Sequence, residues 1–123
     1  MDQEASAIVV DLAKRLIAFM RDLDPSWKKA YFRFSSEGFK HGSNGSYVAE
    51  SKVSLIDPFE SGVFFDRMNA SSIELLKLLG KDRGVLLLSA DSTFDYEMKY
   101  EFQDMGRWRI TKLDGGTGIP EGV

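Results

Sequence analysis

The residues whose types and spacing could do chemistry are three carboxylates on one short run, Asp95, Glu97 and Glu101. In residues 93–103 every even position is large and apolar and every odd position is polar. Because the side chains of a strand alternate between its faces, the three carboxylates share one face. Paired carboxylates are what glycoside hydrolysis requires. Here, however, they share an exposed face with Lys99 and have no apolar pocket to raise a carboxyl pKa. We therefore predict a solvated face or a recognition surface and assign no catalytic residue.

Few other residues could take part in catalysis or bind a metal or cofactor. His41 is the only histidine, and nothing around it in the sequence indicates a catalytic triad, so we expect a histidine on a surface loop. The absence of cysteine excludes disulfides, thiol catalysis and zinc sites with cysteine ligands. Gly38, Gly42 and Gly45 are not followed by the Lys-Ser or Lys-Thr pair of a phosphate-binding loop. We expect no metal, no cofactor and no enzymatic activity.

Acidic charge is concentrated around the alternating run. Residues 91–104 carry a net charge of −4, whereas the whole chain carries −3. Such a patch repels phosphate backbones and attracts cationic surfaces, so we expect no direct binding of nucleic acid through it. The candidate binding residues are its five acids, Asp91, Asp95, Glu97, Glu101 and Asp104. The candidates for a secondary protein interface are three aromatic residues without an inner-face assignment, Phe59, Phe64 and Phe65.

The elements that must position these residues follow from hydrophobic periodicity. Apolar residues at steps of three and four predict helices, and strict alternation predicts strands. The predicted elements are a helix over 3–23, a strand over 27–34, a glycine-rich loop over 37–46, a strand over 46–56, an unassigned segment over 57–68, a helix starting at Ser71, and strands over 85–89, 93–103 and 107–113. The helix start at Ser71 depends on a capping box with Glu74. This order predicts an α+β fold, in which an antiparallel sheet of about five strands carries both helices on one face.

The length of 123 residues fits a single domain over 1–114, followed by a glycine-rich tail over 115–123 that we expect to be flexible. The chain begins with acidic residues where a secretory signal would carry basic ones. Its longest apolar runs are far too short to cross a bilayer. We therefore expect a cytoplasmic protein that does not bind a membrane.

Three stretches in the second half of the chain carry a family resemblance. Val85-Leu86-Leu87-Leu88, the alternating run over 94–100 and Arg107-Trp108-Arg109-Ile110 resemble the C-terminal part of YezG-like immunity proteins. The first half agrees in outline, because an amphipathic helix and Pro25-Ser26-Trp27 lead into an aromatic strand. These small bacterial proteins are antitoxins of polymorphic toxin and contact-dependent growth-inhibition systems. The resemblance implies a non-enzymatic protein that binds and neutralises a cognate toxin domain.

Many toxins of this kind are nucleases, whose surfaces must be basic to hold phosphate backbones. An acidic strand face on the antitoxin would attract such a surface and compete with the nucleic acid. For the protein alone we expect a monomer or weak dimer. Two alternatives stay open: a small-molecule-binding or enzymatic α+β domain with a cleft between sheet and helices, and a plain adaptor domain whose acidic face serves solubility.

Overall fold

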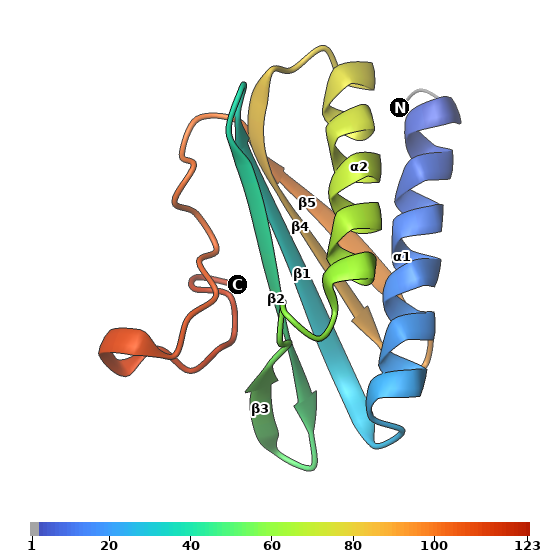
Figure 1. Ribbon diagram of the computed structural model, residues 1–123, viewed down its shortest axis with the longest axis vertical. Coiled ribbons are helices and arrows are strands. Elements are labelled where there is room, and N and C mark those ends of the chain that lie inside the picture. Colours follow the sequence, from blue (N-terminus) through green and yellow to red (C-terminus); the bar gives the residue numbers. More distant parts are fainter. Residues whose placement is uncertain (1–2) are drawn as a thin grey trace.

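The computed structural model describes residues 3–123, which form two helices and a five-stranded antiparallel sheet. Both helices cover one face of the sheet, and the C-terminal segment crosses the other face (Figure 1). The elements in chain order are α1 (Gln3–Leu23), β1 (Trp27–Glu37), β2 (His41–Ala49), β3 (Lys52–Leu55), α2 (Gly62–Leu78), β4 (Arg83–Asp91), β5 (Tyr96–Glu101) and the short 3₁₀ helix η1 (Leu113–Gly115). The strand order is β3-β2-β1-β4-β5. The predicted α+β fold is confirmed. Within residues 3–123, neither α-helix combines the length and hydrophobicity needed to traverse a bilayer.

Helix α1 begins and ends where the periodicity predicts. Leu12, Leu16 and Met20 recur at steps of four and are fully buried against the sheet. The helix ends where the amide of Asp24 donates to the carbonyl of Met20 at 2.9 Å. The Asp24 carboxylate then accepts a hydrogen bond from the amide of Ser26, which turns the chain into β1.

The glycine-rich stretch belongs mainly to a strand. β2 begins at His41 and pairs with β1 along its length, so the predicted loop over 37–46 is wrong except for a tight turn at Gly38, where φ is 91°. Glycine is needed inside the strand because the chain is crowded there. A Cβ on Gly45 would lie 2.8 Å from the carbonyl oxygen of Tyr31 and 3.0 Å from Cδ1 of Ile56. Composition alone does not separate this use of glycine from a flexible loop.

The predicted strand over 46–56 is two strands. Glu50 and Ser51 both adopt positive φ, 52° and 67°, and reverse the chain between β2 and β3. Neither residue is a glycine, so the turn leaves little signal in the sequence.

Helix α2 starts at Gly62, so the predicted start at Ser71 is wrong. The neighbouring Ser72 is buried inside the helix, where its hydroxyl donates to the carbonyl of Met68 at 2.7 Å. A serine hydroxyl that donates to the carbonyl four residues earlier has its hydrogen-bonding capacity satisfied inside a helix and does not cap the helix start. Most of the unassigned segment over 57–68 is therefore a turn and the first part of this helix.

The sheet has a core on each face. The larger core lies under the helices and contains the even residues of β1, Ala30, Phe32 and Phe34. The smaller core lies on the opposite face, where Tyr31, Val85 and Leu87 contact two residues of the C-terminal segment, Trp108 and Ile110. Strand β4 is buried on both faces, as expected of a central strand.

The last predicted strand, over 107–113, does not form. Trp108 has φ of 60°, which interrupts an extended backbone. Carbonyl groups of the segment accept hydrogen bonds from side chains of the sheet instead of from a neighbouring strand: Arg33 donates to Met105 at 2.7 Å and to Arg107 at 2.9 Å, and Asn44 donates to Ile110 at 2.9 Å.

The tail folds back along this segment. The amide of Gly118 donates to the carbonyl of Thr111 at 2.9 Å, and the amide of Glu121 donates to the carbonyl of Arg109 at 3.0 Å. Gly118 and Pro120 are buried. The flexibility of residues 115–123 stays a prediction.

Candidate protein-binding surface

Strand β5 forms one edge of the sheet and carries the alternation that the sequence predicts. Met98, Tyr100 and Phe102 pack against the core under the helices. Glu97 and Lys99 pair with Ser89 and Leu87 of β4 and therefore lie on the opposite face, the one that the C-terminal segment crosses. The five candidate acids lie on β5, in the turns that flank it, or, for Asp91, at the last residue of β4.

Asp91 organises the turn before β5. Its carboxylate accepts hydrogen bonds from the Thr93 hydroxyl at 2.6 Å, from the Thr93 amide at 2.9 Å and from the Asp95 amide at 3.2 Å. The hydrogen bond from the Thr93 hydroxyl is the main reason that the pKa of Asp91 lies below its usual value. Asp91 therefore has a structural role within the turn.

Glu101 and Asp104 organise the turn after β5. One oxygen of Glu101 accepts hydrogen bonds from the amides of Gln103 and Asp104, and the other lies 2.6 Å from a guanidinium nitrogen of Arg107. Led by the hydrogen bond from Arg107, these contacts lower the pKa of Glu101 to about 2. Asp104 accepts a hydrogen bond from the amide of Gly106 at 2.9 Å. Both carboxylates are thus occupied by local contacts.

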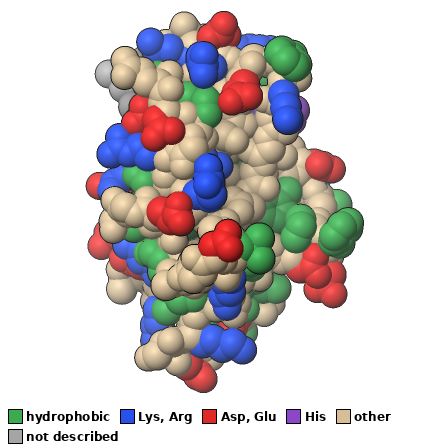
Figure 2. All heavy atoms as spheres, turned by 90° about the vertical axis from the view of Figure 1, so that its left-hand side faces the viewer, with side chains coloured by type: hydrophobic (Ala, Val, Ile, Leu, Met, Phe, Trp, Pro, Cys, Tyr) green, Lys and Arg blue, Asp and Glu red, His purple; other side chains and the backbone are tan. Residues whose placement is uncertain are grey.

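Asp95 and Glu97 are the two candidate acids whose carboxylates accept no hydrogen bond from the described residues. Both residues are exposed, and with Lys29 and Asp91 they line a small hollow of about 140 Å³ on the sheet face opposite the helices. The only ion pair of either residue within 3–123 joins Glu97 to Lys99 at 3.8 Å, and an exposed pair at that distance restrains the carboxylate weakly. Acidic and basic side chains are interspersed over this side of the molecule (Figure 2). The acidic surface available to a partner is therefore smaller than the sequence suggests.

A second surface lies at the same edge of the sheet, on the face that the helices cover. An apolar groove of about 350 Å³ runs between α1 and the turn before β5. Its lining residues are Val10, Ala13, Lys14, Ile17, Ala18, Arg21, Phe94 and Tyr96. Phe94 adopts φ of 73° and is 58% exposed, and the guanidinium of Arg21 lies 5.9 Å from the centre of its ring.

The alternation over 93–103 does not reveal this groove, because it assigns Phe94 and Tyr96 to the apolar, inward-facing side of a strand. The strand begins only at Tyr96, so Phe94 follows the turn instead of the alternation, and Tyr96 is 45% exposed. The sequence did contain an indication of the groove: Val10, Ile17 and Ala18 are apolar and lie on one side of α1, next to its buried stripe.

The three candidate aromatics of the secondary interface separate in the structure. Phe59 lies in the turn before α2 and is 96% exposed. Phe65 is buried, and Phe64 stacks on Phe19 of α1 with ring centres 4.0 Å apart. Phe64 and Phe65 therefore hold α2 against α1 and the sheet, and only Phe59 is available to a partner.

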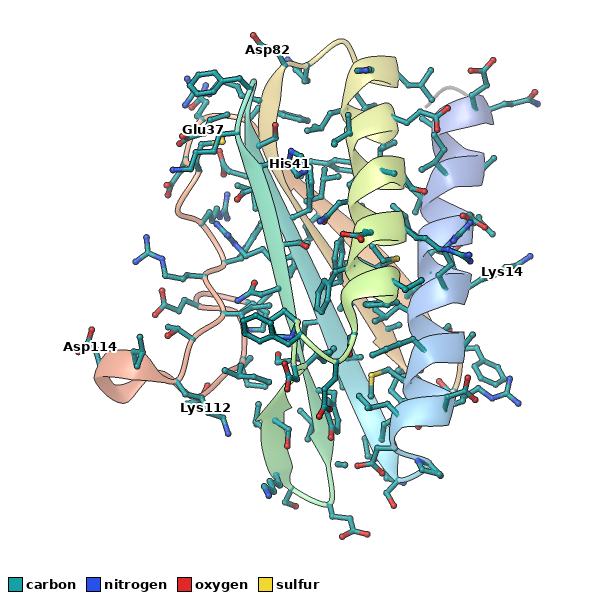
Figure 3. All side chains as sticks on the ribbon, in the orientation of Figure 1. Lys14, Glu37, His41, Asp82, Lys112 and Asp114 are labelled. Atoms are coloured by element: carbon teal, nitrogen blue, oxygen red, sulfur yellow. The ribbon has the colours of Figure 1, made fainter. Side chains whose placement is uncertain are left out.

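His41 lies at the first residue of β2 and not in a loop, although it is exposed as predicted. Its ring extends from β2 toward α2 (Figure 3) and lies 5.9 Å from the ring of Phe34. Ser36, Lys77 and Asp82 line the hollow beside it. Within the described part of the chain, no three histidine or carboxylate side chains come together in a way that could hold a metal ion.

Comparison of the chain with protein-family models and with curated proteins finds no match. The geometry of the β5 edge and the sequence resemblance are therefore the two indications of function.

Proposed function

We propose that this protein is a cytoplasmic immunity protein, which binds a cognate toxin domain and neutralises it without catalysing a reaction. The observation that carries the proposal is the placement of Asp95 and Glu97. Their carboxylates are exposed side by side at the start of an edge strand, next to the aromatic residues Phe94 and Tyr96. Charged residues that flank exposed aromatics are typical of protein-binding surfaces.

The electrostatics favour a basic partner. The local acids Asp91 and Glu101 hold the turns at the two ends of β5, so the backbone that presents Asp95 and Glu97 is fixed before binding. A preorganised acidic site attracts a cationic surface and loses little conformational freedom on binding. The nucleic-acid-binding surface of a nuclease toxin is such a surface.

The test is binding of a toxin domain, sought in the gene next to this one, to the wild-type protein and to the Asp95→Lys/Glu97→Lys variant. We expect the variant to associate about tenfold more slowly at low salt and to protect cells less well, because attraction has become repulsion. Asp114→Lys is the control at a distant site, since Asp114 is an exposed acid on η1 close to Lys112 (Figure 3), which binds Val53 of β3 at the other edge of the sheet. It changes the net charge by half as much as the double variant.

Two results would count against the proposal. A loss of binding free energy in the control of half that in the double variant, or more, would show that net charge, and not this site, attracts the toxin. A wild-type protein that neither binds the toxin domain nor protects cells would refute the immunity function itself.

A further inference from the structure

The two edges of the sheet differ in how they are protected. At the β3 edge, the Lys112 ammonium donates to the carbonyl of Val53, and Gly118 lies so close that a Cβ there would be 2.9 Å from a Val53 methyl carbon. β3 is also only four residues long. A short, covered strand is a usual protection against pairing with another chain.

The β5 edge has no such cover among residues 3–123. β5 is the terminal strand of the sheet, and β4 is its only strand partner within residues 3–123. The segment that the sequence predicts as the next strand crosses the sheet face instead, where Trp108 is buried. The outward-facing backbone groups of β5 therefore lack strand partners, and such an edge is a template for another strand.

We propose that β5 pairs with β5 of a second copy of this chain, antiparallel and centred on Met98, to form one continuous sheet. The charges of the strand select this register. With Met98 opposite the partner's Met98, Glu97 lies opposite the partner's Lys99, and the two-fold axis repeats the pair. Glu101 would lie opposite the partner's Asp95, but Asp95 precedes the strand and the charge of Glu101 is already balanced by its ion pair with Arg107. Unlike charges directly opposite each other stabilise a strand pair.

The two neighbouring registers are less favourable. A centre at Glu97 would place Glu97 opposite the partner's Glu97 and would leave Lys99 opposite the partner's Asp95, which precedes the strand. Identical antiparallel strands can slip only in steps that keep their side chains on the same faces. Moving the centre from Met98 to Lys99 would place Lys99 opposite the partner's Lys99 and Glu97 opposite the partner's Glu101. Like charges directly opposite each other are destabilising. The alternation of Glu97 and Lys99 is thus self-complementary in the Met98-centred register.

The helix side of the edge adds apolar contacts. In the Met98-centred register Tyr96 lies opposite the partner's Tyr100, and aromatic cross-strand pairs stabilise a sheet. A two-fold axis perpendicular to the sheet keeps both helix layers on one face. The apolar groove beside Ile17 and Phe94 borders this edge, so the helix layer of the second copy would approach it and cover apolar surface that is exposed in the monomer.

The test measures the mass of the full chain by sedimentation equilibrium, without toxin, from micromolar to near-millimolar concentration. We expect a concentration-dependent dimer. Glu97→Lys and Lys99→Glu should each weaken dimerisation by about tenfold or more, because each places like charges opposite each other twice. The double variant Glu97→Lys/Lys99→Glu restores unlike pairs and should dimerise like wild type. Asp114→Lys, which lies away from β5, should also dimerise like wild type.

The inference does not depend on the proposed function, because no toxin enters the measurement. A protein that stays monomeric over the whole concentration range overturns it. A dimer that persists unchanged in both single variants overturns this interface.

Discussion

A guanidinium nitrogen of Arg107 lies 2.6 Å from a carboxylate oxygen of Glu101, and this ion pair closes the turn through which the chain leaves β5. The second oxygen of Glu101 accepts two backbone hydrogen bonds in the same turn. Arg107 in turn covers the ring of Trp108, with 4.7 Å between the guanidinium carbon and the ring centre. The pair therefore joins the edge strand to the segment that covers the opposite face of the sheet.

This ion pair makes stability depend on pH. The pKa of Glu101 is about 2 in the folded protein and 4.5 for an unperturbed glutamate. Because the folded value is the lower one, the carboxylate stabilises the fold fully above about pH 4.5, and that contribution is lost as the pH falls toward 2. We expect Glu101→Gln to be less stable than wild type at neutral pH and to lose less stability on acidification. Urea denaturation at a series of pH values measures both effects.

Arg107→Gln provides a second variant for the same prediction. It removes the largest cause of the low pKa and leaves the carboxylate in place, so the loss of stability should become shallower. Asp91, whose pKa is also lowered, leaves a residual dependence of the same sign in both variants. If Glu101→Gln kept the full wild-type pH dependence, Glu101 would not be its source.

The crowding at Gly45 predicts a difference between two glycines of one strand. Gly45→Ala places a methyl group against the backbone of Tyr31 and the side chain of Ile56 and should destabilise the protein by about 2 kcal/mol. Gly42→Ala is the matched control, because a Cβ there meets nothing within 4 Å. Thermal and urea unfolding of the two variants give the comparison. Equal stability of both would mean that the strands move apart to accept the methyl group.

The glycines of β2 also illustrate how far the fold could be predicted from the sequence. Local periodicity was sufficient for α1 and for the alternating faces of β1 and β5, because one residue pattern there matches one geometry. It failed at β2, where glycine is required by a neighbouring strand distant in sequence and not by flexibility. It failed at the start of α2, where Ser71 and Glu74 fit a capping box but lie inside the helix.

For the candidate site, alternation placed Glu97 on the correct face but did not reveal which carboxylates serve the turns. Asp91 and Glu101 bind backbone amides two to four residues away, and those contacts exist only once the turns form. The missing last strand has a non-local cause. The side chain of Arg33 donates hydrogen bonds to carbonyl groups more than seventy residues later in the chain. A single sequence does not reveal that pairing.

The C-terminal segment should be essential for stability because it covers the second core. Trp108 is 4% exposed and contacts the core that contains Tyr31 and Leu87. Trp108→Ala should reduce the free energy of unfolding by about 3 to 5 kcal/mol. Leu113→Ala is the control, since Leu113 is 76% exposed, and it should change stability little. A small effect of Trp108→Ala in urea denaturation would contradict the placement of the segment on the sheet.

Tyr100 offers a substitution that should stabilise the fold. Its hydroxyl oxygen is buried and has no hydrogen-bond partner among the described residues, and burial raises the pKa of the phenol. In the unfolded chain this hydroxyl binds water, so folding leaves a polar group unsatisfied at a cost of about 1 to 3 kcal/mol. Tyr100→Phe removes the hydroxyl and keeps the ring that packs beside Phe102 with ring centres 6.2 Å apart. We expect the free energy of unfolding to rise by about 1 kcal/mol. Tyr96→Phe is the matched control, because Tyr96 is 45% exposed on the same face of β5 and should change stability little. A loss of stability in Tyr100→Phe would instead indicate that the hydroxyl is hydrogen-bonded to an internal water molecule.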